Sequence, residues 1–408
     1  MSSHEGSAGS TSADGAGTAD RAPWGLLVGA SLIAVSLGAY ELVPASVTPL
    51  LRESLGVGPS AAGLLVSVTF GTAVVASLPV GVVLDRTDSR RAIAAAVGLL
   101  LVAGVWGWQA GADGSYPSLL ASRVLGGVAY VVVWNAGIDV VGRSFPADRQ
   151  ATAVGTFTAS GPLGFAVGQG VGPIIADALG WPAVFPAFAA SALVGLTLFW
   201  PTSRGRGRAV DTPTPTLSDL GAVVTNRRVW IVCGLGFLAY AVYLFMNSWA
   251  PSYLTEELRL SLAVSGVLAA LFPAVGILSR VTGGLLSDRL FDGRRRPVVL
   301  LAFLVSTPIV AGFTALRTVP VVVAALLVAG FAIQLCLGLV FAYVRELVEP
   351  AVAATAVAFL TSVGLAGAFL SPIAAGALIG ATGYGAAFAV AGVLGLLGVV
   401  LAWYAPES

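Results

Sequence analysis

Three ionisable side chains stand inside long apolar stretches of this sequence: Glu41, Arg123 and Arg280. An ionised group at membrane depth is costly, and in membrane proteins such groups mark substrate pathways and proton relays. A carboxyl group beside a guanidinium can gain or lose a proton as its burial and its charge partner change. A guanidinium can also offer two parallel donors to a carboxylate. The three residues are therefore candidates for proton coupling and for anion binding.

Glu41 and Arg123 are expected to lie at similar depth. Glu41 comes several residues before the end of the predicted span 24–48, and Arg123 comes several residues after the start of the predicted span 117–141. At about 1.5 Å of rise per residue, both lie roughly 10 Å from the same membrane surface. We expect them to pair or to share a proton, and a static structural ion pair is the alternative.

Arg280 precedes Asp288 by eight residues, which places it about 12 Å along a helix into the bilayer. That depth is too great for the side chain to reach water easily, so we expect it to face an internal cavity. It could anchor an anion there, or form an ion pair with Asp288 or Glu346. The other side chains expected to line this cavity are Tyr40, Trp134, Asn135, Gln169, Tyr240, Tyr243, Asn247 and Gln334. Among them, Tyr40, Asn135, Gln169, Asn247 and Gln334 are predicted to bind substrate together with Arg280.

Membrane helices must position these residues. The chain is 57% hydrophobic and 10% charged, whereas soluble proteins carry about 25% charged residues. So apolar a chain cannot cover its own surface in water, and the bilayer must be its solvent. Apolar runs of about 20 residues predict twelve spans at 24–48, 58–83, 92–111, 117–141, 151–176, 181–200, 229–251, 262–286, 298–316, 319–344, 352–377 and 383–404. The predicted fold class is an all-α membrane protein.

The spans fall into two predicted halves, 24–200 and 229–405, that resemble each other at an offset of about 203 residues. The matching segments are LLRESL at 50–55 with YLTEEL at 253–258, GVVLDR at 81–86 with GLLSDR at 284–289, and ATAV at 151–154 with ATAV at 354–357. Parallel six-span repeats are a known transporter plan, with the substrate site between the halves near the midplane.

The polar segments set the expected orientation. With the N-terminus inside, only Arg52, Arg259 and Arg317 fall in outer loops, which is the positive-inside rule. Both termini are then cytoplasmic in a multi-pass protein of the plasma membrane. Residues 1–23 are expected to be a disordered cytoplasmic tail and 201–228 a cytoplasmic linker, with a possible surface helix at 216–226.

Two loops in register carry the most specific motif. The first reads Gly81-Val-Val-Leu-Asp85-Arg86, followed by Arg90-Arg91, and the second reads Gly284-Leu-Leu-Ser-Asp288-Arg289. Asp88 stands where the pattern usually has Gly. This pattern resembles the gating loops of the major facilitator superfamily, and the resemblance extends over about 24–405. It implies two pseudo-symmetric six-helix halves around a central cavity, and it implies that the motif residues brace one conformation of the transport cycle.

The resemblance also implies roles for the buried charges. The segment Leu119-xxx-Arg123-xx-Gly126-Gly127 is similar to a pattern of the fourth span in which the Arg is often linked to proton coupling. Members that carry carboxylates, nitrate or other small anions often have an Arg eight residues before the second gating Asp, which is the position of Arg280. Gln169 lies in a Gly-rich stretch similar to an antiporter pattern, at a place where Pro is usual.

We therefore expect a monomeric secondary active transporter of a small organic or inorganic anion, coupled to protons. Its partners would be the solute, protons and the lipid bilayer, with no nucleic acid, cofactor or metal. A proton-coupled drug exporter is the alternative, in which Glu41 attracts cations and Arg280 is structural. A non-transporting membrane sensor is an alternative of another class. No nucleotide-binding loop or catalytic cluster predicts an enzyme.

Overall fold

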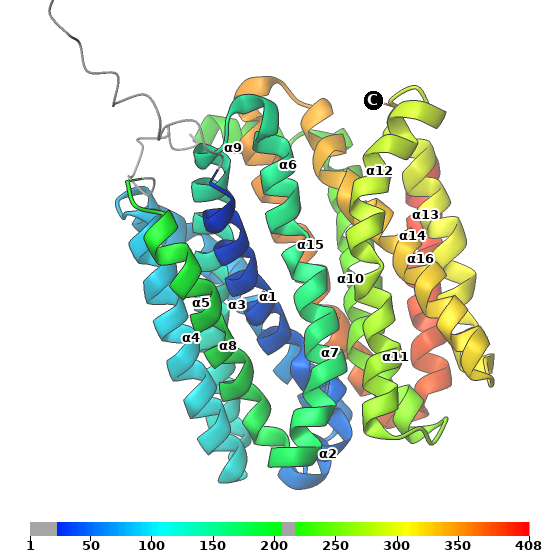
Figure 1. Cartoon of the computed structure of the whole chain (residues 1–408). Coiled ribbons are helices and arrows are strands. Elements are labelled where there is room, and N and C mark those ends of the chain that lie inside the picture. The colour runs from blue at the N-terminus through cyan, green and yellow to red at the C-terminus, as the bar shows by residue number, and fades with distance from the viewer. Residues whose placement is uncertain (1–22, 206–216, 408) are drawn as a thin grey trace, which may run out of the picture.

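The computed structural model describes residues 23–205 and 217–407, and every regular element in these ranges is a helix (Figure 1). The elements of the first half are α1 (Trp24–Ser46), α2 (Thr48–Leu55), α3 (Pro59–Asp85), α4 (Ser89–Ala112), α5 (Tyr116–Ser144), α6 (Ala147–Thr158), α7 (Ser160–Leu179), η1 (Trp181–Ala183) and α8 (Val184–Thr202). Most run along one common direction, as expected for spanning helices.

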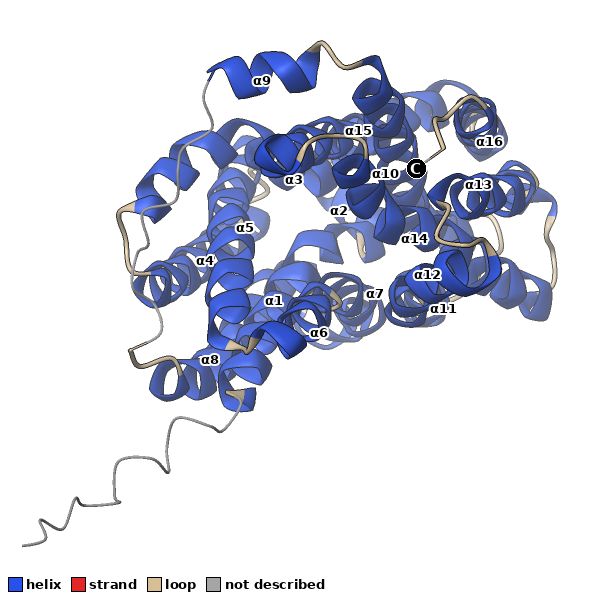
Figure 2. Ribbon diagram, turned by 90° about the horizontal axis from the view of Figure 1, so that it is seen from above, coloured by secondary structure: helices blue, strands red, loops and turns tan. Residues whose placement is uncertain are grey.

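The second half repeats this plan. Its elements are α10 (Arg227–Glu256), α11 (Leu262–Ala274), α12 (Gly276–Leu290), α13 (Arg295–Ala311), η2 (Phe313–Ala315), α14 (Val319–Glu346), η3 (Pro350–Val352), α15 (Ala353–Thr382) and α16 (Tyr384–Trp403). Between the halves, α9 (Leu217–Val224) forms within the predicted linker and lies at the rim of the bundle in Figure 2, where it contacts α10 and α15. The rest of that linker, 206–216, and the predicted tail up to residue 22 lie outside the described residues.

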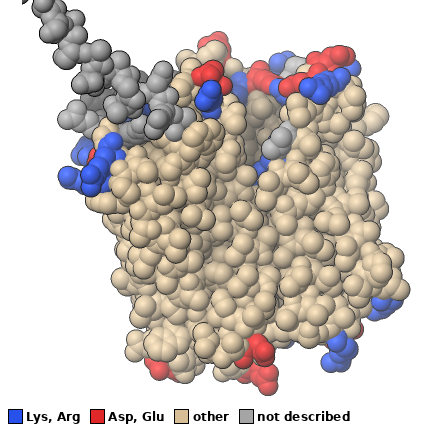
Figure 3. Space-filling view, viewed as in Figure 1, with Lys and Arg blue, Asp and Glu red and all other residues tan. Residues whose placement is uncertain are grey.

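Ten helical segments of the described chain are long and apolar enough to cross a membrane. The two further predicted spans, 151–176 and 298–316, are helical but fall outside that group. The first is divided at Ala159 into α6 and α7, and the second contains α13, which has only 17 residues. Figure 3 shows charged side chains gathered at the two ends, with an uncharged outer surface between them. This distribution is that of a protein surrounded by hydrocarbon at mid-height.

The helix interruption between α11 and α12 has a local cause. Pro273 cannot donate a backbone hydrogen bond, and the helix restarts at Gly276. Gln334 of α14 donates its amide to the carbonyl of Phe272 at 3.0 Å and to that of Gly330 at 3.2 Å. A Cβ atom at residue 276 would collide with the side-chain amide of Gln334, so the glycine leaves that amide room to reach the main chain at the break. The structure thus gives Gln334, predicted to bind substrate, the role of satisfying main-chain groups at the break.

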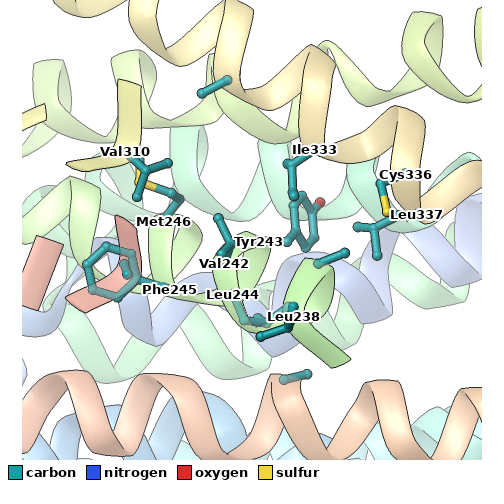
Figure 4. Close-up of a cluster of buried hydrophobic side chains, with 14 of the residues drawn as sticks. Leu238, Val242, Tyr243, Leu244, Phe245, Met246, Val310, Ile333, Cys336 and Leu337 are labelled. Carbon is teal, nitrogen blue, oxygen red and sulfur yellow. The ribbon is translucent and has the colours of Figure 1, made fainter. Parts of the chain in front are cut away.

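A large apolar cluster fills the second half and extends into the first. Figure 4 shows part of it, with Tyr243 of α10 among Leu238, Ile333 and Leu337. The first half has a second cluster built mainly from α1, α4, α5 and α8. Small residues permit this close packing of helices, which is the usual means by which helices associate in lipid.

The two halves meet along α3 with α15 and along α7 with α11 (Figure 2). We call the end that carries α2 the closed face, because these contacts lie near it: Gly63 faces the backbone of Pro372, and Gly376 faces that of Pro59. We call the end that carries α9 and the C-terminus the linker face. In the space-filling view, a recess opens toward the linker face between the halves (Figure 3).

Polar contacts join the halves at the same end. Arg52 of α2 forms an ion pair with Glu256 of α10 at 3.0 Å. Tyr384 of α16 donates its hydroxyl to the other carboxylate oxygen of Glu256, also at 3.0 Å. The closed face is therefore held by backbone contact at glycines and by one ion pair that crosses between the halves.

Candidate functional site

Arg123 of α5 is completely buried and ties three helices of the first half together. Its guanidinium donates to the backbone carbonyls of Tyr40 at 2.7 Å, Glu41 at 2.5 Å and Leu65 at 3.1 Å, and to the hydroxyl of Thr69 at 3.2 Å. Its central carbon also lies 4.6 Å from the centre of the Tyr40 ring. Main-chain oxygens thus supply most of the acceptors that this buried cation needs.

Glu41 lies next to Arg123, but the two side chains do not form the expected ion pair. Arg123 binds the backbone carbonyl of Glu41. Within the described part of the chain, the Glu41 carboxyl group and the Arg123 guanidinium form no ion pair. The Glu41 Oε1 atom is buried without a hydrogen-bond partner. A buried carboxylate without donors is very costly, so this arrangement suits a carboxyl group that can carry a proton. Its role in proton coupling stays a prediction.

Arg280 lies at the boundary between the halves, on α12 just after the helix break. Its Nη1 donates to the backbone carbonyl of Thr158, the last residue of α6, at 3.3 Å. That carbonyl is free because Pro162, four residues later, has no N–H to donate. The Nε atom of Arg280 is buried without a partner.

The predicted acidic partners do not reach Arg280. Asp288 and Glu346 both bind Arg295 of α13, at 2.7 Å and 3.0 Å. No carboxylate in the described part of the chain pairs with Arg280. The alternative in which Arg280 forms an ion pair with Asp288 or Glu346 is therefore not realised in this structure.

Two further predicted ligands bind each other across the interface of the halves. Gln169 of α7 donates its amide to the backbone and side-chain oxygens of Asn247 of α10, each at 3.0 Å. Asn247 in turn donates to the carbonyl of Tyr243 at 2.8 Å. Both amides are buried, so in this conformation they contribute to the contact between the halves. Asn135 of α5 is exposed, and Tyr40 is buried against Arg123.

Aromatic rings form a continuous series that begins at Phe157, next to the Thr158 carbonyl bound by Arg280, and sequence reasoning identified only part of it. We define the aromatic series as Phe157, Trp134, Tyr130, Phe70, Phe165, Tyr243 and Phe272 in order of contact, with neighbouring ring centres 5.3–6.4 Å apart. The last two rings belong to the second half, so the series crosses the interface. The phenol groups of Tyr130, Tyr243 and the nearby Tyr240 lie within electrostatic range of Arg280. The four phenylalanines of the series were not predicted to line the cavity. Phe is common on lipid-facing and buried helix surfaces alike, so its presence in the sequence does not indicate a binding site.

The first gating loop lies at the linker face. Asp88, which replaces the usual Gly, caps α4 by accepting a hydrogen bond from the Arg91 N–H at 3.1 Å. Arg90 donates to the carbonyl of Trp200 and lies 3.6 Å above its ring. Asp85 ends α3, and Arg86 follows it with an exposed side chain.

The second gating loop is braced within its own half. Asp288 and Glu346 share Arg295, whereas Arg289 is exposed. A side chain placed at Gly81 or Gly284 would meet nothing within 4 Å. Within the described residues, no neighbouring group therefore packs closely against these two glycines, which agrees with a linker face that is open.

Comparison with known proteins places this arrangement in a family. A sequence model of the Major Facilitator Superfamily matches residues 27–364 and 251–408. The hexuronate transporter of Bacillus subtilis is 23% identical over 374 residues, which cover 85% of this chain and 86% of that protein. The probable L-galactonate transporter of Escherichia coli is 23% identical over 270 residues, which cover 61% and 58%.

The fold is also that of a solved transporter. The crystal structure of a bacterial homolog of the human lysosomal transporter Spinster, in an inward-facing and unoccupied conformation, superposes with a TM-score of 0.79 at 16% identity. The match covers 95% of this chain and 97% of that one. The predicted all-α membrane fold is confirmed, and the chain belongs to the Major Facilitator Superfamily.

Proposed function

We propose that this chain is a secondary transporter of a small anion and that Arg280 anchors the anion. The observation that carries the proposal is the isolation of its guanidinium. It lies between the halves with Nε unpartnered and with no carboxylate partner in the described residues. A bound carboxylate would supply the missing countercharge and two acceptors at once. The hexuronate and L-galactonate transporters, both named for anionic sugars, support this class of substrate.

The asymmetry of the two faces supports alternating access. The closed face is joined by Gly63, Gly376 and the Arg52–Glu256 pair, while the recess opens at the linker face. We assign the linker face to the cytoplasm, because most loop arginines lie there. On this assignment both termini are cytoplasmic in the plasma membrane, and the structure is an inward-facing monomer.

Glu41 is the proposed proton site. Its Oε1 atom is buried without a hydrogen-bond donor. The neighbouring Arg123 binds the backbone carbonyls of Tyr40 and Glu41 and not the Glu41 carboxyl group. Loss of the proton from Glu41 would place a negative charge beside Arg123. The Arg123 guanidinium would then be favoured to leave the backbone carbonyls and bind the Glu41 carboxylate. Proton binding would then be linked to the position of α1 relative to α5.

Two alternatives are less well supported. A drug exporter for cations would place its ligand beside Arg280, whose unpaired positive charge opposes a cation. A sensor would not need both a closed and an open face. The proposal is accordingly a transporter and not an enzyme or a receptor.

The test is solute uptake by purified protein in liposomes with an imposed pH gradient. Glucuronate, nitrate and a lipophilic cation would be compared in wild type, Arg280→Gln and Arg259→Gln, the last being an exposed arginine at the closed face. Loss of charge-assisted hydrogen bonds worth about 1.5–3 kcal/mol should weaken anion uptake at least about tenfold in Arg280→Gln alone. Cation uptake that survives Arg280→Gln but fails in Glu41→Gln would instead establish the drug exporter.

A further inference from the structure

The surroundings of Arg280 offer little to a polyhydroxylated solute. Each hydroxyl of a sugar acid needs a hydrogen-bond partner when it leaves water, because an unpaired buried hydroxyl is costly. Side-chain amides are the usual partners. Here Gln169 donates to Asn247, Asn247 donates to the backbone carbonyl of Tyr243, and Gln334 donates to helix carbonyls. The Oε1 atoms of Gln169 and Gln334 have no hydrogen-bond partner but are buried, out of reach of a solute in this conformation. Asn135 is exposed, so few amide groups are left for the hydroxyls of a sugar.

The hydroxyl side chains of the interface helices are engaged in the same way. On α3, Thr72 and Ser77 donate to the carbonyls four residues before them, at 2.9 Å and 2.5 Å. On α15, Thr361 and Ser362 do so at 2.8 Å and 3.1 Å. Their protons are used within their own helices, so these hydroxyls are not free donors for a solute.

Aromatic surface takes the place of polar groups beside Arg280. Within the aromatic series, the Tyr243 ring stacks between Phe165, at 6.0 Å and 17°, and Phe272, at 5.7 Å and 28°. Phe165 and Phe272 come from the two different halves. Tyr130 and Trp134 at the other end of the series are half-buried, so part of their surface remains available.

The free donors near Arg280 suit one end of a ligand only. Tyr130 and Tyr240 are half-buried, and no hydrogen bond of their hydroxyls with another described residue is formed. The guanidinium itself can satisfy one carboxylate with two parallel donors. The remaining ligand surface would then lie against rings, where an apolar group is stabilised and a hydroxylated one is not.

We propose that the anion held most tightly at Arg280 is a carboxylate with an apolar or aromatic body, in preference to a sugar acid or a small inorganic ion. This inference rests on the proposed function, since it names the substrate class of the same site. A small inorganic anion would use the guanidinium but leave the aromatic series without a ligand surface to contact. A hexuronate would lose the hydration of its hydroxyls and find few hydrogen-bond partners in exchange.

The test uses equilibrium binding in detergent, because apolar acids cross bilayers unaided and would obscure uptake. Isothermal titration compares cyclohexanecarboxylate with glucuronate, which share a six-membered ring and a carboxylate but differ in hydroxyl groups. Benzoate and nitrate complete the panel. We expect cyclohexanecarboxylate and benzoate to bind at least about tenfold more tightly than glucuronate and nitrate, since a site lacking hydrogen-bond partners selects against hydroxyls.

Variants separate the inference from the function on which it rests. Arg280→Gln should weaken the apolar acids at least about tenfold, and Trp134→Leu should weaken benzoate several-fold, while Arg259→Gln changes neither. Thermal unfolding of each variant verifies that it is folded. Tighter, Arg280-dependent binding of glucuronate or nitrate would overturn the inference and leave the transporter of anions standing. Binding that is unaffected by Arg280→Gln, or absent for all four anions, would overturn both.

Discussion

Replacing Gly63 by alanine should open the closed face. A Cβ atom there would lie 2.7 Å from the carbonyl carbon of Pro372 and 3.2 Å from the backbone nitrogen of Ile373. Both are backbone atoms of a packed helix, so the clash cannot be relieved by a rotamer change. Overpacking of this kind costs about 1–3 kcal/mol. Because the clash exists only when α3 and α15 are in contact, that cost falls on this conformation and should shift the equilibrium about 5–150-fold toward opening.

Cysteine labelling can measure this shift. Ser265 of α11 is buried near the closed face, and Ser265→Cys is a near-isosteric reporter whose thiol becomes reachable when the face opens. The native Cys233 and Cys336 are buried and provide the background rate. We expect Gly63→Ala to accelerate maleimide labelling of the reporter in detergent about 5–150-fold.

The matched control is an exposed glycine inside another helix, α4. Gly98→Ala introduces the same methyl group at a position with nothing within 4 Å, so labelling of the closed face should stay at the wild-type rate. If Gly63→Ala labels no faster than Gly98→Ala while both proteins remain folded, the glycine contact does not hold the face closed, and the reasoning is wrong.

Three further results are expected. Arg52→Gln should raise the same labelling rate by less than Gly63→Ala, because its partly exposed pair with Glu256 is worth only about 0.2–1 kcal/mol; an equal or larger effect would contradict this ranking. Gln334→Ala should lower the free energy of unfolding by about 1–3 kcal/mol, read from thermal or chemical unfolding, since it leaves the Phe272 carbonyl uncapped. Glu41→Gln should abolish the dependence of anion uptake on the pH gradient while anion binding persists, and uptake that still follows the gradient would exclude Glu41 as the proton site.

The membrane fold could be predicted because one physical constraint dominates it. Every spanning helix must present about 20 apolar residues, and the sequence shows these runs directly. The interruption at Ala159 was not predicted, although Pro162 lies close by, because proline is often accommodated within membrane helices. The length of α13 was likewise overestimated, since the helix ends at Ala311 and η2 follows.

The candidate site could be predicted only in part. The depth of Arg123 and Arg280 was estimated from helical rise. Both lie inside apolar helices, where a cation needs hydrogen-bond acceptors. The partners themselves were not readable, because backbone carbonyls of Tyr40 and Thr158 bind these cations, and every residue has a carbonyl. Gln169 resembled a ligand for the same reason: an amide inside an apolar helix signals a buried hydrogen bond without naming its partner.

The two helix interruptions also divide the moving parts of the molecule. α7 and α11 pack together near the closed face, while α6 and α12 flank the recess beyond Ala159 and Val275 and are linked by the hydrogen bond from Arg280 to Thr158. Each interrupted helix therefore consists of an anchored segment and a segment joined to it by a joint. Bending at these joints offers the recess a way to narrow without rotation of either half as a body, and Arg280 lies on one of the two segments that such bending would move.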